Sequence, residues 1–238
     1  MRPIRLLPAF LSVGTWTMAS RVLGLARDVI MAALLGTGTV AQAFLIAFTL
    51  PNMFRRFFAE GAFNLAFVPM FAKRVEGDED PAGFGSDALS ALGSLLIAFT
   101  LVGQLLMPWL VLALASGFAG DERFDLAVLY GRIAFPYILF ISLTALLSGI
   151  LNSLGRFALA AAAPILMNMV MIGFLLAGHW TGGDVGLWQI WSVPVAGVAQ
   201  LGLVWWGAEQ AGMRIRPRLP RLSPELRRLA AVAGPAVL

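Results

Sequence analysis

Long uninterrupted runs of apolar residues dominate the chain and predict its structural elements. A helix that crosses the hydrocarbon core of a bilayer needs about 20 mostly apolar residues, because each residue adds about 1.5 Å of length. Six stretches meet this requirement, and three of them contain no charged residue. The pattern therefore predicts an all-α polytopic membrane protein. Its expected spans are residues 9–35, 40–72, 88–116, 126–151, 157–180 and 185–208.

A further helix is expected after the sixth span. Ser223 suits an N-cap, Pro224 the first helical position and Glu225 the first turn. The chain ends before this seventh helix is long enough to span. We therefore expect a six-helix transmembrane unit over residues 1–210. A basic cytoplasmic link and the start of a seventh helix would follow over 211–238, as in a fragment or a unit cut at that helix.

The composition excludes a soluble protein. Apolar residues make up 59% of the 238 positions and charged residues 13%, whereas soluble domains carry about 25% charged residues. The chain has no cysteine, which excludes disulfides, thiolate nucleophiles and cysteine-based metal sites. A net charge of +4 would suggest nucleic acid as the partner of a soluble chain, but here the positions of the basic residues matter more than their sum. No nucleic acid, cofactor or metal is expected.

The basic residues are distributed unevenly between the two ends of the expected spans. With the N-terminus in the cytoplasm, the outer links hold one basic residue, Arg123, and the inner segments hold eleven. Cytoplasmic segments of membrane proteins carry the excess of Lys and Arg, so this distribution predicts a cytoplasmic N-terminus. The eleven are Arg2, Arg5, Lys73, Arg74, Arg156, Arg214, Arg216, Arg218, Arg221, Arg227 and Arg228.

The first span has a second interpretation as a cleaved signal peptide. Arg2 and Arg5 precede an apolar run, and small residues follow at 17–20. An uncleaved first helix is favoured, because the apolar pattern resumes after Asp28 and continues to Gly36, with five more spans beyond it.

The links between the spans are too short to hold a soluble catalytic domain. Lys73 is the single lysine and follows Phe71-Ala72, so the chain contains no phosphate-binding loop of the Walker type. His179, the single histidine, lies at an outer helix end beside Trp180. An interfacial role for this residue is favoured over metal binding or proton relay.

A small set of charged residues remains within or beside the spans. A charge at the bilayer centre costs about 2.5–3.5 kcal/mol on insertion scales, so such residues normally face a polar interior. The short turn at 36–39 makes the first two spans an antiparallel hairpin. Counting from this turn at about 1.5 Å per residue, Arg21 and Arg55 both lie about 22 Å below it, and Arg27 about 12–14 Å. The full set is Arg21, Arg27, Arg55, Arg56 and Arg132, with the acids Asp28 and Glu60.

Structural roles compete with a binding role for these charges. Arg55, Arg56 and Glu60 lie near the inner interface, where long side chains can reach the headgroups. Arg27 and Asp28 could form a purely structural salt bridge. Arg132 lies close enough to the outer end of its span to reach that interface as well. The other four arginines against two acids nevertheless leave an excess of positive charge. This excess favours a water-filled cavity that attracts anions, and guanidinium groups suit phosphates in particular.

The second stretch is longer than a span requires. Its 33 residues would make about 50 Å of helix, and Pro51, Gly61 and Pro69 are places where it can bend or break. Broken helices beside a polar cavity are typical of transporters. A proline in each remaining span, at 108, 136, 164 and 194, suits helices that bend during a conformational cycle.

Three sequence blocks carry a family resemblance. Residues 20–28 have the sequence SRVLGLARD, residues 50–63 have LPNMFRRFFAEGAF, and residues 66–69 have AFVP. In order and spacing these blocks resemble the MurJ (MviN) lipid II flippase family. Later segments, such as 132–136, fit the family less specifically, and the resemblance covers essentially the whole chain.

The resemblance implies a fold and a function. The family belongs to the multidrug/oligosaccharidyl-lipid/polysaccharide exporter superfamily and has fourteen helices in two six-helix lobes plus a C-terminal pair. This chain would be the N-terminal lobe plus the start of helix seven. The implied activity moves lipid II, the undecaprenyl-pyrophosphate-linked peptidoglycan precursor, across the bacterial cytoplasmic membrane by alternating access. Implied partners are lipid II, membrane lipids and possible cell-wall synthesis proteins, without covalent chemistry.

The resemblance also implies roles for the charged residues. Arg21, Arg27 and Arg55 match the arginines assigned to the pyrophosphate-sugar headgroup. Asp28 matches the acid beside the second of these, and Ser20 matches a small polar residue of the cavity.

Three more positions are compared with the family pattern. Arg56 and Glu60 match a charged pair near the cytoplasmic gate. Gln42 stands where many members carry an aspartate, so an acid of the outer gate at this position is in doubt.

Three other functions are weighed against this one. A drug exporter of the same superfamily, with a cationic substrate, would need an acid-rich cavity. A membrane-embedded glycosyl- or phosphotransferase would need clustered carboxylates, and only Asp28 and Glu60 are available. In a structural scaffold, the buried charges would serve as interhelical contacts. An exporter of another lipid-linked oligosaccharide is the nearest alternative.

Overall fold

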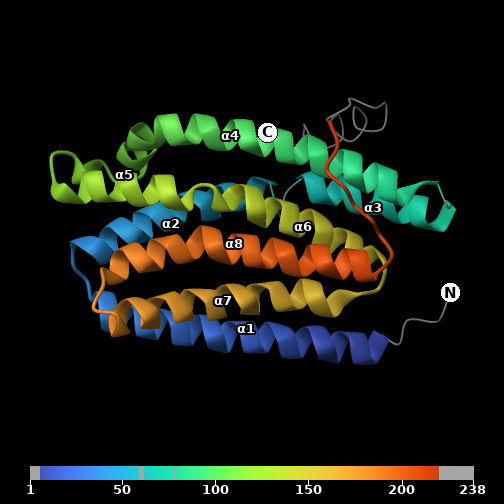
Figure 1. Ribbon diagram of the computed structural model, residues 1–238, viewed down its shortest axis with the longest axis horizontal. Helices are drawn as coiled ribbons and strands as arrows, with labels where there is room; N and C mark the ends of the chain where they lie inside the picture. Colours follow the sequence, from blue (N-terminus) through green and yellow to red (C-terminus); the bar gives the residue numbers. More distant parts are fainter. Residues whose placement is uncertain (1–5, 59–61, 78, 220–238) are drawn as a thin grey trace.

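The computed structural model describes residues 6–58, 62–77 and 79–219, which are helical over most of their length and contain no strand. Figure 1 shows long helices lying roughly side by side along the longest axis of the molecule. The helices are α1 (Leu6–Leu35), α2 (Thr39–Phe58), α3 (Ala62–Gly77), α4 (Pro81–Leu114), the short 3-10 helix η1 (Ser116–Phe118), α5 (Glu122–Ala134), α6 (Tyr137–Ser153), α7 (Phe157–Trp180) and α8 (Val185–Gln210).

The last four expected spans are confirmed. Among the described residues, α4, the α5–α6 pair, α7 and α8 are long and apolar enough to cross a membrane. The first two expected spans are helical as well, but α1 and α2 carry charged side chains and fall outside this apolar class.

The expected single stretch over 40–72 is described as two helices, on either side of residues 59–61, which lie outside the described residues. α2 ends at Phe58 and α3 begins at Ala62. Pro51 and Pro69 lie within these helices and end neither of them. Gly61, the third expected breakpoint, lies outside the described residues, as does the expected start of the seventh helix at 223–225.

Pro136 separates the two halves of the fourth span. α5 ends at Ala134 and α6 begins at Tyr137, because proline lacks the N–H that would continue the helical ladder. By contrast, the assigned helices α4, α7 and α8 continue through their own prolines. The helical assignment of the fourth span is therefore interrupted at this proline.

The packing of the bundle separates α1 from α2. α1 packs mainly on α7, and α2 packs mainly on α5, whereas α1 and α2 make few contacts with each other. In Figure 1, α7 and α8 continue the row of helices that begins with α1. The turn between α1 and α2 has Gly36 at a φ of 63°, a left-handed conformation that suits glycine. The first hairpin is therefore open, which leaves room between its arms.

Aromatic rings fill the core where α2, α4 and the α5–α6 bend meet. The ring of Phe54 lies edge-on to that of Phe99 at 5.0 Å and to that of Phe135 at 5.9 Å. Phe99 and Phe135 stack at 5.8 Å. Gly103 allows the Phe135 ring to lie directly against the backbone of α4, because a Cβ at position 103 would overlap three ring carbons. The helices that carry Arg55 and the α5–α6 bend are thus held together by a dense apolar cluster.

Candidate functional site

A cavity of about 790 Å³ opens between four helices and contains part of the predicted charged set. Its walls come from α1, α2, α6 and α7. The charged residues among its described lining are Arg21 of α1 and Arg55 of α2. The full lining is Thr17, Ser20, Arg21, Arg55, Ser148, Asn152, Phe157, Ala160, Ala161 and Pro164. The cavity is therefore net positive, with hydroxyl and amide groups beside the two arginines.

Arg21 and Arg55 reach this cavity from opposite arms of the open hairpin. Counting residues from the Gly36 turn gives both side chains the same depth, and both line the same space. Thr17 lies one helical turn from Arg21 on α1, so it lines the same face. Ser20, the small polar residue of the first motif, also lines the wall.

Arg27 and Asp28 lie outside the lining of this cavity and contact each other. The guanidinium donates to one carboxylate oxygen of Asp28, at 3.0 Å from Nε and 2.8 Å from Nη2. The side chain of Arg27 is 18% exposed and that of Asp28 is 55% exposed. The ion pair therefore has one mostly buried partner and one exposed partner.

The second contact of Arg27 joins α1 to α7. Its Nη1 donates to Oδ1 of Asn168 at 3.0 Å and lies 3.6 Å from Sδ of Met171. Asn168 is buried, and its Nδ2 donates to the backbone carbonyl of Ser20 at 3.2 Å. One amide side chain thus binds both ends of the motif at residues 20–28.

Asn168 is a site residue that the sequence-based predictions missed. The available signal was a single amide side chain in an otherwise apolar, uncharged stretch, where an unpaired polar group is costly. Gly24 faces this side chain, since a Cβ at position 24 would lie 3.7 Å from Nδ2 of Asn168. The glycine in the motif therefore gives Asn168 room to reach α1.

The remaining predicted positions are not part of the cavity lining. Arg56 is exposed at the end of α2, and Glu60 lies outside the described residues. Arg132 is exposed on α5, and its backbone carbonyl accepts a hydrogen bond from Gln104 at 3.0 Å.

Gln42 takes part in a polar cluster at the other end of the bundle. Nη1 of Arg123 donates to Oε1 of Gln42 at 2.9 Å, and Nε of Arg123 donates to Asp121 at 2.8 Å. Nε2 of Gln42 donates to the backbone carbonyl of Thr37 at 3.0 Å. The hydrogen bond from the Arg123 side chain lowers the pKa of Asp121 below its ordinary value. Arg123, the one basic residue of the expected outer links, thus connects the start of α2 to the start of α5.

The sequence comparison identifies the family. Residues 31–238 match the model of the family described as "Lipid II flippase MurJ". The chain belongs to the MurJ family. A relative from Rhizobium tropici, named a probable lipid II flippase MurJ, is 47% identical over 98% of this chain and 45% of its own length. The lipid II flippase MurJ of Burkholderia cenocepacia is 41% identical over 83% of this chain and 39% of its own length.

Solved structures support the same fold. A lipid II flippase MurJ in an inward closed conformation matches with a TM-score of 0.74 at 22% identity, over 94% of this chain and 46% of its own. A transporter of the MOP superfamily from Pyrococcus furiosus matches with a TM-score of 0.70 at 17% identity, over 100% of this chain and 54% of its own. The chain spans about half the length of the curated relatives that it matches, 45% for the first two. It is an all-α multi-pass membrane protein with the fold of the N-terminal lobe of a MurJ-type transporter.

Proposed function

We propose that the full-length protein carrying this chain is a lipid II flippase of the bacterial cytoplasmic membrane. It moves the undecaprenyl-pyrophosphate-linked precursor of peptidoglycan from the inner to the outer leaflet by alternating access. The observation that carries the proposal is the pairing of Arg21 and Arg55 in one net-positive cavity of a MurJ-family lobe. Such a protein serves peptidoglycan synthesis and hence cell-wall growth and cell shape.

The cavity chemistry suits a diphosphate attached to a polar headgroup. Guanidinium groups bind phosphate oxygens through paired, charge-assisted hydrogen bonds. Removing a phosphate from water without such partners is costly, since an isolated ion in an apolar medium loses its solvation. Two arginines in a recess of about 790 Å³ offset this cost while the polyprenyl tail stays in lipid.

The roles proposed for the motif residues follow from their surroundings. Arg21 and Arg55 bind the diphosphate, and Ser20 contributes polarity to the same wall. Arg27 meets the headgroup as it moves past the middle of α1, with its orientation set by Asp28 and Asn168.

The gate and the domain limits are further parts of the proposal. Arg56 and Glu60 form the charged pair near the cytoplasmic gate. Residues 1–210 act as one lobe, and 211–238 form the basic cytoplasmic link and the start of the next helix.

The orientation follows from charge. Eleven basic residues on one side against one on the other favour a cytoplasmic N-terminus. The transport cycle requires no bond to be made or broken, so the protein acts as a transporter without a cofactor and not as an enzyme. Its partners are lipid II and the surrounding lipids, with other cell-wall synthesis proteins as further candidates.

Two neighbouring functions are less well supported. A drug exporter with a cationic substrate requires acidic side chains in the cavity, whereas the charged groups of the described lining are both basic. An exporter of a different lipid-linked oligosaccharide would use the same diphosphate chemistry. A substrate comparison with purified lipid-linked sugars separates that case.

A depletion-rescue experiment with the full-length gene tests the proposal. Arg21→Ala and Arg27→Ala are expected to insert normally but not to support growth or the appearance of lipid II in the outer leaflet. Arg132→Ala is the matched control, because this exposed arginine of α5 belongs neither to the cavity lining nor to the motif at residues 20–28. Normal lipid II translocation by both Arg21→Ala and Arg27→Ala would overturn the proposed function.

A further inference from the structure

The chain after α8 does not leave the bundle as a free linker. Figure 1 shows it running from the end of α8 across to α4. We define residues 213–219 as the strap. Ile215 of the strap is buried, and a Cβ at Gly85 of α4 would lie 2.7 Å from its Cδ1. The strap is therefore anchored by an apolar side chain that is seated against a glycine.

Two serines of α4 bind the backbone of the strap. The N–H of Arg216 donates to Oγ of Ser86 at 3.0 Å, and the N–H of Arg218 donates to Oγ of Ser90 at 2.8 Å. Each hydroxyl also donates to a carbonyl of α4, one turn earlier. Four residues of helix rise about 6 Å, and two residues of extended chain span about 7 Å. The spacing of the serines along α4 thus matches alternate N–H groups of the strap.

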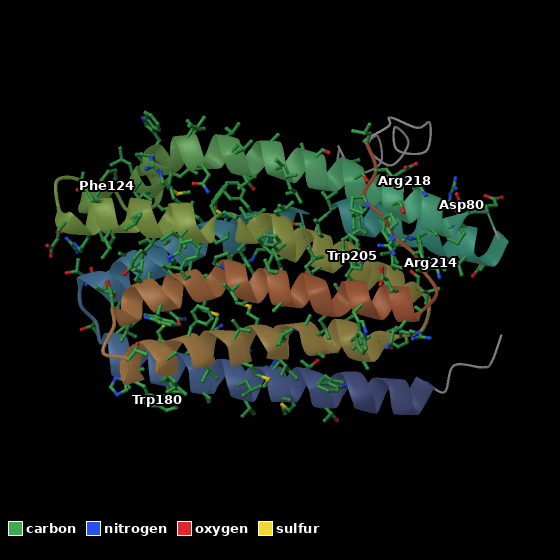
Figure 2. The ribbon with its side chains drawn as sticks, in the orientation of Figure 1. Asp80, Phe124, Trp180, Trp205, Arg214 and Arg218 are labelled. Atoms are coloured by element: carbon green, nitrogen blue, oxygen red, sulfur yellow. The ribbon has the colours of Figure 1, made fainter. Side chains whose placement is uncertain are left out.

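This attachment places arginine side chains in a row at the surface. Arg214, Arg216 and Arg218 are all exposed, and they alternate with Ile215 and Pro217. Arg216 lies 3.3 Å from a carboxylate oxygen of Glu209, while no ion pair joins Arg214 or Arg218 to any other described residue. In Figure 2 both labelled arginines lie at the same end of the molecule as Asp80, which caps α4.

The row lies beside the charged end of α4. Asp87, between the two serines, is the last charged residue before the uncharged stretch 88–116. We therefore expect the strap to cross α4 at the level of the lipid headgroups, on the side that the excess of basic residues predicts to be cytoplasmic.

We propose that the strap is a docking surface for the phosphate groups of anionic phospholipids. Basic residues at a membrane surface attract anionic lipids, and guanidinium groups bind phosphate oxygens directly. An exposed row of cations suits many neighbouring headgroups, whereas a single free anion would require an enclosed pocket. Since the serines already fix the backbone, less conformational freedom is lost when the arginines bind.

The experiment uses the full-length protein in nanodiscs of phosphatidylcholine that contain phosphatidylglycerol. Mass spectrometry measures the enrichment of phosphatidylglycerol around the protein, and hydrogen exchange measures the protection of the Arg216 and Arg218 amides. Replacing Arg214 and Arg218 by Gln is expected to lower the affinity for phosphatidylglycerol by about fivefold per arginine. Phosphatidylglycerol is expected to slow exchange of both amides in the unmodified protein.

The decisive variant leaves every charge in place. Ser86→Ala combined with Ser90→Ala removes both acceptors of the strap and is expected to lower the enrichment at least about twofold, since the docked backbone loses both hydrogen bonds. Ser94→Ala is the matched control, because Ser94 continues the same series on α4 and its hydroxyl donates to the carbonyl of Ser90, while the two strap amides donate to Ser86 and Ser90. Arg156→Gln removes an exposed arginine from the α6–α7 turn and controls for net charge.

Each other outcome contradicts the proposal. Arg156→Gln and the strap arginine variants could lose phosphatidylglycerol enrichment equally, with no loss in the double serine variant. That result would show that overall charge, and not the strap, attracts the lipid. Equal protection of the two amides by inorganic phosphate would assign the row to free anions. Rapid exchange of both amides in every lipid would show that the strap is not docked.

Discussion

Arg27 of α1 donates to Asn168 of α7 at 3.0 Å, and Asn168 in turn donates to the backbone of α1 at Ser20. This reciprocal pair joins two helices whose residues are 141 positions apart in the sequence. It fixes the direction of a guanidinium that would otherwise have several rotamers open to it. Asn168 is therefore a positioning residue for Arg27.

Asn168→Ala tests this relationship. The change removes a buried amide with two partners and leaves the Nη1 of Arg27 without its acceptor, which costs about 1–3 kcal/mol of stability. We expect a lower unfolding temperature for the purified full-length protein. We also expect reduced rescue of lipid II translocation, because Arg27 loses its fixed orientation.

Met169→Ala is the control for this variant, since Met169 is the adjacent residue and is exposed. It should unfold and translocate like the unmodified protein. If Asn168→Ala keeps full translocation despite a loss of stability, the contact with Arg27 is structural only.

The sequence could predict depth but not neighbours. Counting residues from the Gly36 turn places Arg21 and Arg55 at the same depth below it, because helical rise is a local property of the chain. The partner of Arg27 depends on which helix packs against α1, and that is settled by the shapes of distant segments. An amide side chain in an uncharged run of residues indicates a buried polar contact, but it does not identify the residue on the other side of that contact.

The prolines of the second stretch show a similar limit. The excess length of this stretch predicts a break, and its two prolines and one glycine are the three places where a break is expected. The assigned helices nevertheless continue through Pro51 and Pro69. A proline costs one hydrogen bond and a local clash, which tertiary packing can absorb. Pro136, by contrast, does separate two helices, and the ring of the preceding residue, Phe135, packs against α4. The outcome at each proline therefore depends on the packing around it.

Neighbouring arginines on α2 provide a matched test of the cavity. Arg55 lines the cavity and Arg56 is exposed outside it. Arg55→Ala should weaken binding of lipid II to the purified full-length protein by about tenfold or more, since a hydrogen bond to a charged group is worth about 1.5–3 kcal/mol. Arg55→Lys should recover part of the loss through its charge, without the paired geometry of the guanidinium.

Arg56→Ala is expected to change equilibrium binding far less, although a slower transport cycle would fit its proposed membership of the gate pair. Binding losses of the same size in Arg55→Ala and Arg56→Ala would mean that general positive charge, and not the cavity, attracts the substrate.

The outer cluster predicts an acid-dependent loss of stability. Because the side-chain hydrogen bond from Arg123 lowers the pKa of Asp121, the folded state favours the deprotonated carboxylate. Its contribution is complete above the ordinary pKa of an aspartate and disappears as the pH falls through the lowered value. Asp121→Asn should therefore lower the unfolding temperature at neutral pH and flatten its dependence on pH in the acidic range.

Asp125→Asn, which alters another acid in the first turn of α5, serves as the comparison for Asp121→Asn. Thermal unfolding across a series of acidic buffers gives both curves. Parallel curves for the two variants would remove the assignment to the Arg123 contact.

Glycine-to-alanine substitutions on α4 and α8 should have opposite effects on stability, because α4 approaches the α5–α6 bend closely and the site on α8 is open. Gly103→Ala places a Cβ onto the ring of Phe135, which is completely buried and held between the rings of Phe54 and Phe99. The ring has no free direction in which to move, so overpacking should cost about 1–3 kcal/mol.

Gly202→Ala on α8 meets no atom within 4 Å and should gain up to about 1 kcal/mol, because alanine is the better helix former. Chemical unfolding of the two full-length variants in the same detergent measures both effects. Equal stability of the two variants would show that the Phe135 ring can move away and that the bend is not held by this contact.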